Sequence, residues 1–119
     1  MKKILLLLLT TFIFAQEPIV EWLQNFPVIT GDVMDVQTTL DGGYILTGWS
    51  YGENGSDLIL LKTDSYGNMN WYNTFSVNQE NCNCQMQGSS VIQSSDGGYV
   101  ISGNIVMSGA DWTDVLLLK

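Results

Sequence analysis

Short runs of β-prone residues separated by glycine turns cover most of the chain after residue 30. Residues 33–39 lead into Asp41, Gly42 and Gly43, and the chain resumes with the run YILTGW from Tyr44. Residues 58–63 lead through the turn DSYGN into MNWYNTF at residues 69–75. Glycine supplies the positive φ angles that tight reversals require. The pattern predicts four antiparallel strands in two hairpins.

The third of these strands lacks the usual alternation of apolar and polar positions. Residues 58–61 read Leu-Ile-Leu-Leu. A half-buried strand alternates, whereas a strand covered on both faces is apolar throughout. We therefore expect both faces of this strand to be buried, as they are where sheets stack.

The four-strand pattern is repeated. DGGYILTG at residues 41–48 returns as DGGYVISG at residues 96–103, 55 residues later, and DLILLK at residues 57–62 returns as DVLLLK at residues 114–119, 57 residues later. A period of about 50 residues is typical of propellers and repeat arrays. We place the first unit at about residues 33–75 and an incomplete second unit at about residues 86–119.

A weaker copy of the fourth-strand pattern precedes the first unit. Trp22 and Phe26 in EWLQNF correspond to Trp71 and Phe75 in NWYNTF, with both pairs shifted by 49 residues. Residues 20–26 are therefore predicted to be a strand of the fourth, closing type, which the second unit lacks.

These motifs resemble the DGGY-type β-propeller repeats of proteins secreted by Gram-negative bacteria. The resemblance rests on the DGGY motif with Gly48, on the DLILLK strand and on the turn from Asp64 to Trp71. It implies an all-β fold of antiparallel four-stranded blades, and roles in adhesion, surface scaffolding or glycan contact. Such proteins frequently end in a sorting domain, and we predict none within residues 16–119.

The chain is short for this architecture. Propellers have about four to eight blades, so the sequence predicts an incomplete propeller, a truncated product or part of a gene. The alternative is a small β-meander or sandwich. It is less favoured because the apolar strand at residues 115–118 would then be an unpaired edge.

The amino-terminal segment has the layout of a secretory signal. Lys2 and Lys3 precede an apolar run at residues 4–14, and Ala15 offers a cleavage site. The run is shorter than the roughly 20 residues of a membrane span, and no cysteine near the cut could carry a lipid. We predict a signal peptide at residues 1–15 and an exported repeat region at residues 16–119, secreted or at the cell surface, without stable membrane insertion.

The acidic composition of the chain excludes several classes of function. Removal of the signal leaves two lysines against twelve acidic residues, with no arginine and no histidine. Nucleic acid is excluded as a partner because phosphate binding needs clustered cations. Catalytic His-containing triads and the usual zinc sites are also excluded. No cofactor, metal or catalytic residue is predicted.

Cys82 and Cys84 lie in an insertion of six residues relative to the preceding repeat. Export favours oxidation, so we expect a disulfide within this loop. A bridge to another chain is the alternative.

Recurrent acidic residues have two interpretations. Asp57 and Asp114 recur at the head of the third strand, near Asp111, and could contribute to a calcium site. An acid that returns in each unit more often accepts hydrogen bonds from nearby backbone N–H groups. We favour this second interpretation, and read DSYGN as a hairpin turn.

Four tryptophans offer candidate binding surfaces. Trp22 and Trp71 hold equivalent positions, which indicates packing between blades, whereas Trp49 and Trp112 are expected at loop edges. Trp49 and Trp112 are the candidate glycan contacts, because aromatic rings stack on sugars and loops carry most binding sites.

The sequence thus predicts a secreted or surface binding or scaffold module that contacts an extracellular glycan or protein. The alternative is a carboxylate-dependent glycan hydrolase or lyase. Such an enzyme needs two carboxylates about 5 to 10 Å apart, which the pairs Asp32 with Asp35 or Asp111 with Asp114 could supply.

Overall fold

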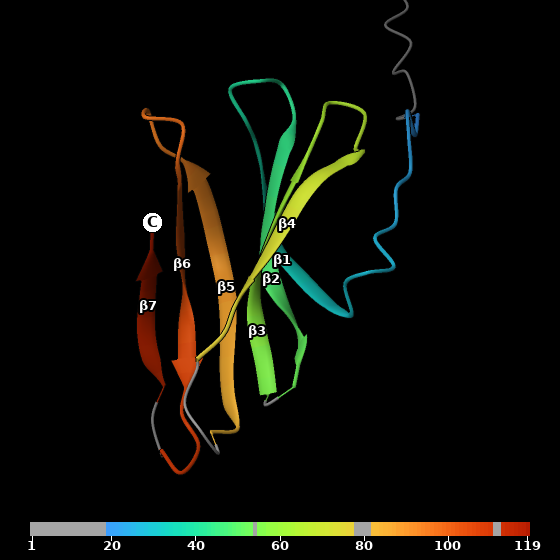
Figure 1. Cartoon of the computed structure of the whole chain (residues 1–119). Helices are drawn as coiled ribbons and strands as arrows, with labels where there is room; N and C mark the ends of the chain where they lie inside the picture. Colours follow the sequence, from blue (N-terminus) through green and yellow to red (C-terminus); the bar gives the residue numbers. More distant parts are fainter. Residues whose placement is uncertain (1–18, 54, 78–81, 111–112) are drawn as a thin grey trace, which may run out of the picture.

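The computed structural model describes residues 19–53, 55–77, 82–110 and 113–119. Within these residues the chain is all-β, as predicted, with no helix. In the described part of the chain, no helical segment has the length and hydropathy needed to cross a bilayer. The strands (Figure 1) are β1 (Gly31–Thr38), β2 (Tyr44–Gly52), β3 (Gly55–Thr63), β4 (Met69–Phe75), β5 (Cys84–Gln93), β6 (Tyr99–Val106) and β7 (Asp114–Leu118).

Strands β1 to β4 form an antiparallel meander, here called the first unit. All four strands predicted for this unit are present, and β4 has the predicted bounds. β1 and β3 begin earlier than predicted, at Gly31 and Gly55. The β2–β3 pairing continues outward to Gly52 and Gly55, because glycines at the end of a hairpin allow a tight reversal.

Strands β5 to β7 form a second antiparallel meander, here called the second unit. A bulge at Met34 in β1 recurs at Ser89 in β5, 55 residues later, since each residue is skipped in an otherwise regular pairing. The two units join through a short parallel ladder in which Gly55 and Ser56 of β3 pair with Cys84 and Gln85 of β5. The result is one open seven-stranded sheet with an irregular junction.

The predicted glycine turns are confirmed. Gly42 and Gly97 connect the first two strands of each unit with φ of 82° and 85°. In the DSYGN turn, Asp64 accepts hydrogen bonds from the backbone N–H groups of Tyr66 and Asn68, both at 2.9 Å. Gly67 has a φ of 79°, which favours glycine.

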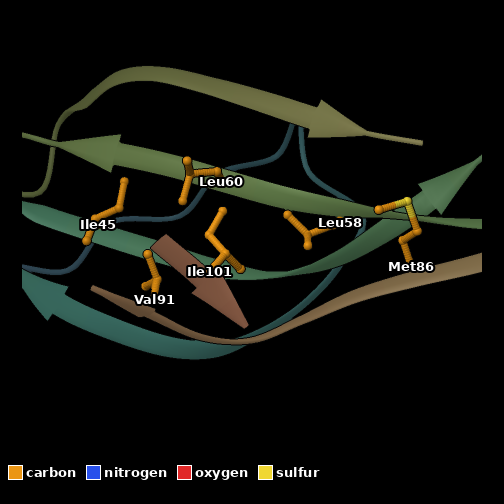
Figure 2. Packing of buried hydrophobic residues seen from close by; sticks show 6 residues of the cluster. All are labelled: Ile45, Leu58, Leu60, Met86, Val91 and Ile101. Atoms are coloured by element: carbon orange, nitrogen blue, oxygen red, sulfur yellow. The ribbon is translucent and has the colours of Figure 1, made fainter. Parts of the chain in front are cut away.

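The hydrophobic core lies between the two units. Its buried side chains come from both meanders and point into one shared space (Figure 2): Ile45, Leu58, Leu60, Met86, Val91 and Ile101. The Leu58–Leu61 stretch of β3 is buried on both faces, as its lack of alternation predicted. At one point the Gly88 backbone closely approaches the Thr47 side chain, because a Cβ on Gly88 would lie 2.1 Å from the Thr47 hydroxyl oxygen.

Hydrogen bonds reinforce this contact between the units. The Asp35 carboxylate accepts from the Ser90 hydroxyl and the Val91 N–H, both at 2.9 Å. Nearby, the backbone N–H of Leu40 donates to the Gln93 side chain at 2.8 Å. Because buried apolar area and directional bonds act together here, the two repeats form one folded body.

The segments at the two ends of the described chain, residues 20–26 and β7, depart from the repeat pattern. Residues 20–26, expected to be a closing-type strand, form no strand; their Trp22 ring instead packs against Tyr44. A strand needs a partner with free backbone groups, and β3 already pairs with β2 and β4. Among the described strands β7 pairs only with β6, and its Val115 and Leu117 are exposed, so the unpaired apolar edge that counted against a small meander is present.

Candidate binding cleft

An open cleft of about 510 Å³ lies at the junction of the two units, where the ends of β2, β3, β5 and β6 meet. It is lined by two aromatic residues, by polar side chains and by part of the parallel ladder: Trp49, Tyr51, Gly55, Ser56, Gln85, Gln87, Asn104 and Val106. Its volume is in the usual range for small-ligand sites.

Trp49 and Tyr51 form the aromatic part of the cleft. Their rings meet edge to face with centroids 5.0 Å apart and an interplanar angle of 88°. Tyr51 is 72% exposed, so its ring is available to a ligand. Trp49 was expected at a loop edge but lies inside β2, paired with Leu58, because β2 runs on to Gly52. Trp112, the other predicted glycan contact, lies outside the described residues.

Among the described residues, the polar lining of the cleft carries no formal charge. Gln85, Gln87 and Asn104 each offer an amide that can both donate and accept, and Ser56 adds a hydroxyl. The Ser56 hydroxyl also donates to the Met86 carbonyl at 3.4 Å. Aromatic faces beside uncharged amides suit a neutral ligand that is rich in hydroxyl groups.

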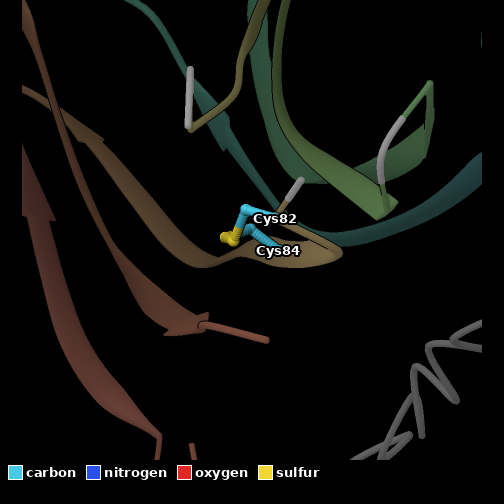
Figure 3. The surroundings of a disulfide bond; sticks show 2 residues. All are labelled: Cys82 and Cys84. Atoms are coloured by element: carbon cyan, nitrogen blue, oxygen red, sulfur yellow. A yellow bond between two sulfur atoms is a disulfide. The ribbon is translucent and has the colours of Figure 1, made fainter. Parts of the chain in front are cut away.

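The start of β5, which carries the two glutamines, is fixed on both sides. Cys82 and Cys84 are joined by a disulfide, with Cα atoms 5.1 Å apart and both side chains buried (Figure 3). Gly55 has a φ of 136°, and a Cβ there would lie 1.9 Å from the Cys84 carbonyl oxygen. Glycine is therefore required at this position, and the disulfide lies directly beside the ladder that closes the cleft.

Among the acidic residues proposed for the enzyme alternative, Asp32, Asp35 and Asp114 are described by the structure, and none of these three lines this cleft. Both Asp35 carboxylate oxygens are engaged, one by the Val36 N–H and Gln37 amide and the other by Ser90 and Val91. The Val91 N–H is the main cause that lowers the pKa of Asp35, because it stabilises the ionised form. Asp35 is thus a structural link between the units.

Asp32 and Asp114 have no comparable side-chain hydrogen-bond network among the described residues. Asp32 pairs with Trp49 in the β1–β2 register, and Asp114 is an exposed residue opposite Ile105. Asp111 lies outside the described residues. Among the residues that the structure does describe, no three potential metal-ligating side chains gather into one group.

A repeated carboxylate and lysine pair is the feature that the sequence analysis missed. Asp41 accepts from the Thr39 hydroxyl, from the Gly43 N–H at 3.1 Å and from the Lys62 ammonium at 3.0 Å. In the second unit, Asp96 and Lys119 repeat the ion pair at 2.8 Å. The joint recurrence of DGG and of the lysine that ends the third strand could have revealed it.

These contacts lower the pKa of both carboxyl groups. The main cause is the Thr39 hydroxyl for Asp41 and the Lys119 ammonium for Asp96. The recurrent DGGY aspartate therefore fixes the turn to the end of the third strand, which is a structural task.

Comparisons of this chain with protein-family models, with curated proteins and with solved structures find no match.

Proposed function

We propose that this protein is an exported, non-enzymatic binding module built from β-propeller-type repeats, and that the cleft beside Trp49 and Tyr51 holds an uncharged glycan. The observation that carries the proposal is the composition of the cleft: two adjacent aromatic rings beside three side-chain amides, without a carboxylate. Sugars present apolar ring faces and many hydroxyl groups, which this lining complements.

Charge favours an uncharged glycan over an acidic one. The exported chain has ten more acidic than basic residues. Its field repels polyanions, and the described cleft offers no lysine or arginine to offset this repulsion. A protein partner that presents tyrosine or amide side chains is the other class of ligand consistent with this lining.

The propeller part of the proposal is supported by what the two units share. The β-bulge, the Asp-Gly-Gly turn and the carboxylate–lysine pair all return at the repeat spacing. The units also stack face to face across an apolar core, as blades do. Export is proposed from the predicted signal at residues 1–15, which lie outside the described residues.

The test is a retention experiment with a panel of neutral and acidic polysaccharides, in which released reducing ends are measured in the same samples. We expect retention on a neutral polysaccharide without new reducing ends. Trp49→Ala should weaken it about tenfold or more, equivalent to about 1.4 kcal/mol. Tyr66→Ala is the matched control, because Tyr66 is 70% exposed in the β3–β4 turn, outside the cleft.

Two results would count against the proposal. Equal retention of the Trp49→Ala and Tyr66→Ala variants would remove the cleft from consideration. Reducing ends that disappear on changing Asp32 or Asp114 to asparagine in a folded variant would instead support the hydrolase alternative.

A further inference from the structure

The second unit has an uncovered apolar face, defined here as the outer face and made up of Ile92, Val100, Val115 and Leu117. Ile92, Val115 and Leu117 are 56%, 91% and 72% exposed, and Val100 is half-buried. Cross-strand register places them together, since Ile92 pairs with Val100, and Leu117 and Val115 lie opposite Ser102 and Asn104 of β6.

The repeat shows what covers such a face. Val100, Val115 and Leu117 correspond by the repeat offsets of 55 and 57 residues to Ile45, Leu58 and Leu60 in the first unit. Those three are almost completely buried, at 0%, 0% and 5% exposure. The side chains that bury them are Met86, Val91 and Ile101, from the facing side of the second unit.

The first unit offers a face of the matching kind. Val91 and Ile101, which pair in register, correspond to Val36 and Leu46, which also pair in register. Val36 is 51% exposed, and Val33 in the same strand is 49% exposed. The outer face of the second unit and this face of the first unit therefore match the two faces that pack against each other inside the chain.

The amino-terminal segment supplies a further part of this contact. Trp71 of β4 packs on Tyr99 of the next unit, and Trp22 packs on Tyr44 with nearly the same geometry. Residues 20–26 thus have the same position relative to the first unit that β4 has relative to the second unit. The edge of β7 is the equivalent of the β3 edge that β4 occupies, and it has no partner among the described strands.

We propose that the outer face and the β7 edge bind a second copy of this chain, head to tail. The first unit of the second copy covers the outer face through Val33, Val36 and Leu46, and its residues 20–26 add as a strand to β7. The contact is heterologous, because each copy uses a different face. Such contacts produce rings where the rotation closes and open assemblies where it does not. The outer face adjoins the proposed glycan cleft, because Val115 pairs with the cleft residue Asn104, but the association is measured by mass and does not require a glycan.

The experiment measures the mass of residues 16–119 by light scattering and sedimentation over a wide concentration range. We expect concentration-dependent oligomers. Val115→Asp and Val36→Asp should each raise the dissociation constant at least tenfold, since each places a carboxylate in the apolar contact. Tyr66→Asp is the control, because Tyr66 is 70% exposed in the β3–β4 turn and belongs to neither face, so this variant should assemble as the unchanged chain does.

The decisive step is to mix the two single variants. Each retains one intact face, so an equimolar mixture should form a one-to-one heterodimer and nothing larger. Hydrogen exchange should then show protection of β7 amides in the Val36→Asp copy alone, because only that copy has an intact outer face.

A chain that stays monomeric at all concentrations would overturn the proposal. So would an assembly that Val36→Asp leaves intact, because a symmetric pairing of outer faces would explain it better. Val115 is 91% exposed, so its substitution removes little folded contact. If Val36→Asp fails to fold by circular dichroism, Val33→Asp replaces it in the same mixture.

Discussion

Trp71 of β4 meets Tyr99 of β6 edge to face, with ring centroids 5.9 Å apart and an interplanar angle of 60°. Trp22 and Tyr44 repeat the relationship at 5.6 Å and the same 60°. The first pair joins two strands in the core region, whereas the second joins a strand to a segment without secondary structure. The Trp–Tyr contact therefore recurs in both units, although residues 20–26 do not form a strand.

The two tryptophans should differ in their contribution to stability. Trp71 is half-buried against the core, so Trp71→Ala should lower the free energy of unfolding by about 2 to 4 kcal/mol. Trp22 is 39% exposed and lies in a segment without secondary structure, so Trp22→Ala should cost less than about 1 kcal/mol. Urea unfolding at pH 7 measures both changes. Equal losses would mean that residues 20–26 are as firmly held as β4.

Lys62 and Lys119 form the same ion pair in different surroundings. The Lys62 side chain is 4% exposed and also donates to the Thr63 carbonyl at 2.7 Å, whereas the Lys119 side chain is 58% exposed. Lys62→Met should therefore cost about 1.5 to 3 kcal/mol, because a buried carbonyl loses a charged donor. Lys119→Met should change stability little, since exposed pairs are screened. The difference in urea midpoints checks the ranking, and a larger loss for Lys119→Met would contradict it.

Much of the fold follows from local sequence. The bounds of β4 and the burial of β3 were predictable because a glycine turn and an unbroken apolar run are signals within a few residues. The cleft was not predictable in this way. Trp49, Gln85 and Asn104 are distant in sequence and come together only through the β3–β5 ladder at Gly55.

The errors in placement have physical causes. Trp49, the last residue of the predicted run YILTGW, was expected at a loop edge, yet Gly52 and Gly55 pair and extend the hairpin past it. Residues 20–26 carry the pattern of β4, but the β3 edge of their own unit is already paired with β4, and the open β7 edge lies at the far end of the described sheet. Local pattern specifies what a segment can become, while the available partners decide whether it becomes a strand.

Stability should fall in acid and stay flat near neutrality. The pKa values of Asp41 and Asp96 are lowered in the folded protein, so their contribution is complete above the unfolded carboxyl pKa of about 3.9 and is lost as the pH falls below it. Without histidine, no side chain with an ordinary pKa titrates between about pH 5 and 8.

Urea midpoints from pH 7 to pH 3 measure this dependence. Asp96→Asn should reduce the loss below about pH 4, because asparagine cannot be protonated there. An Asp96→Asn variant with the acid sensitivity of the unchanged protein would show that other carboxylates dominate.

The close approach of Gly88 to the Thr47 side chain should make this contact between the units sensitive to side-chain size. Gly88→Ala places a methyl group against the fully buried Thr47 side chain and 3.3 Å from Ile101, where the packed core cannot expand. Overpacking of this kind costs about 1 to 3 kcal/mol. Thr47→Ala alone also destabilises, because the Ile59 carbonyl loses its hydroxyl donor.

The double variant separates crowding from general damage. Because Thr47→Ala removes the oxygen that a Cβ on residue 88 would meet, the Gly88→Ala change should cost less in that background than alone, with a coupling of about 0.5 kcal/mol or more. Gly97→Ala is a contrasting control, since its Cβ would meet nothing within 4 Å and only its φ of 85° opposes the change. It should show no coupling to Thr47→Ala. Additive losses for Gly88→Ala and Thr47→Ala would mean that the units do not meet at these two residues in solution.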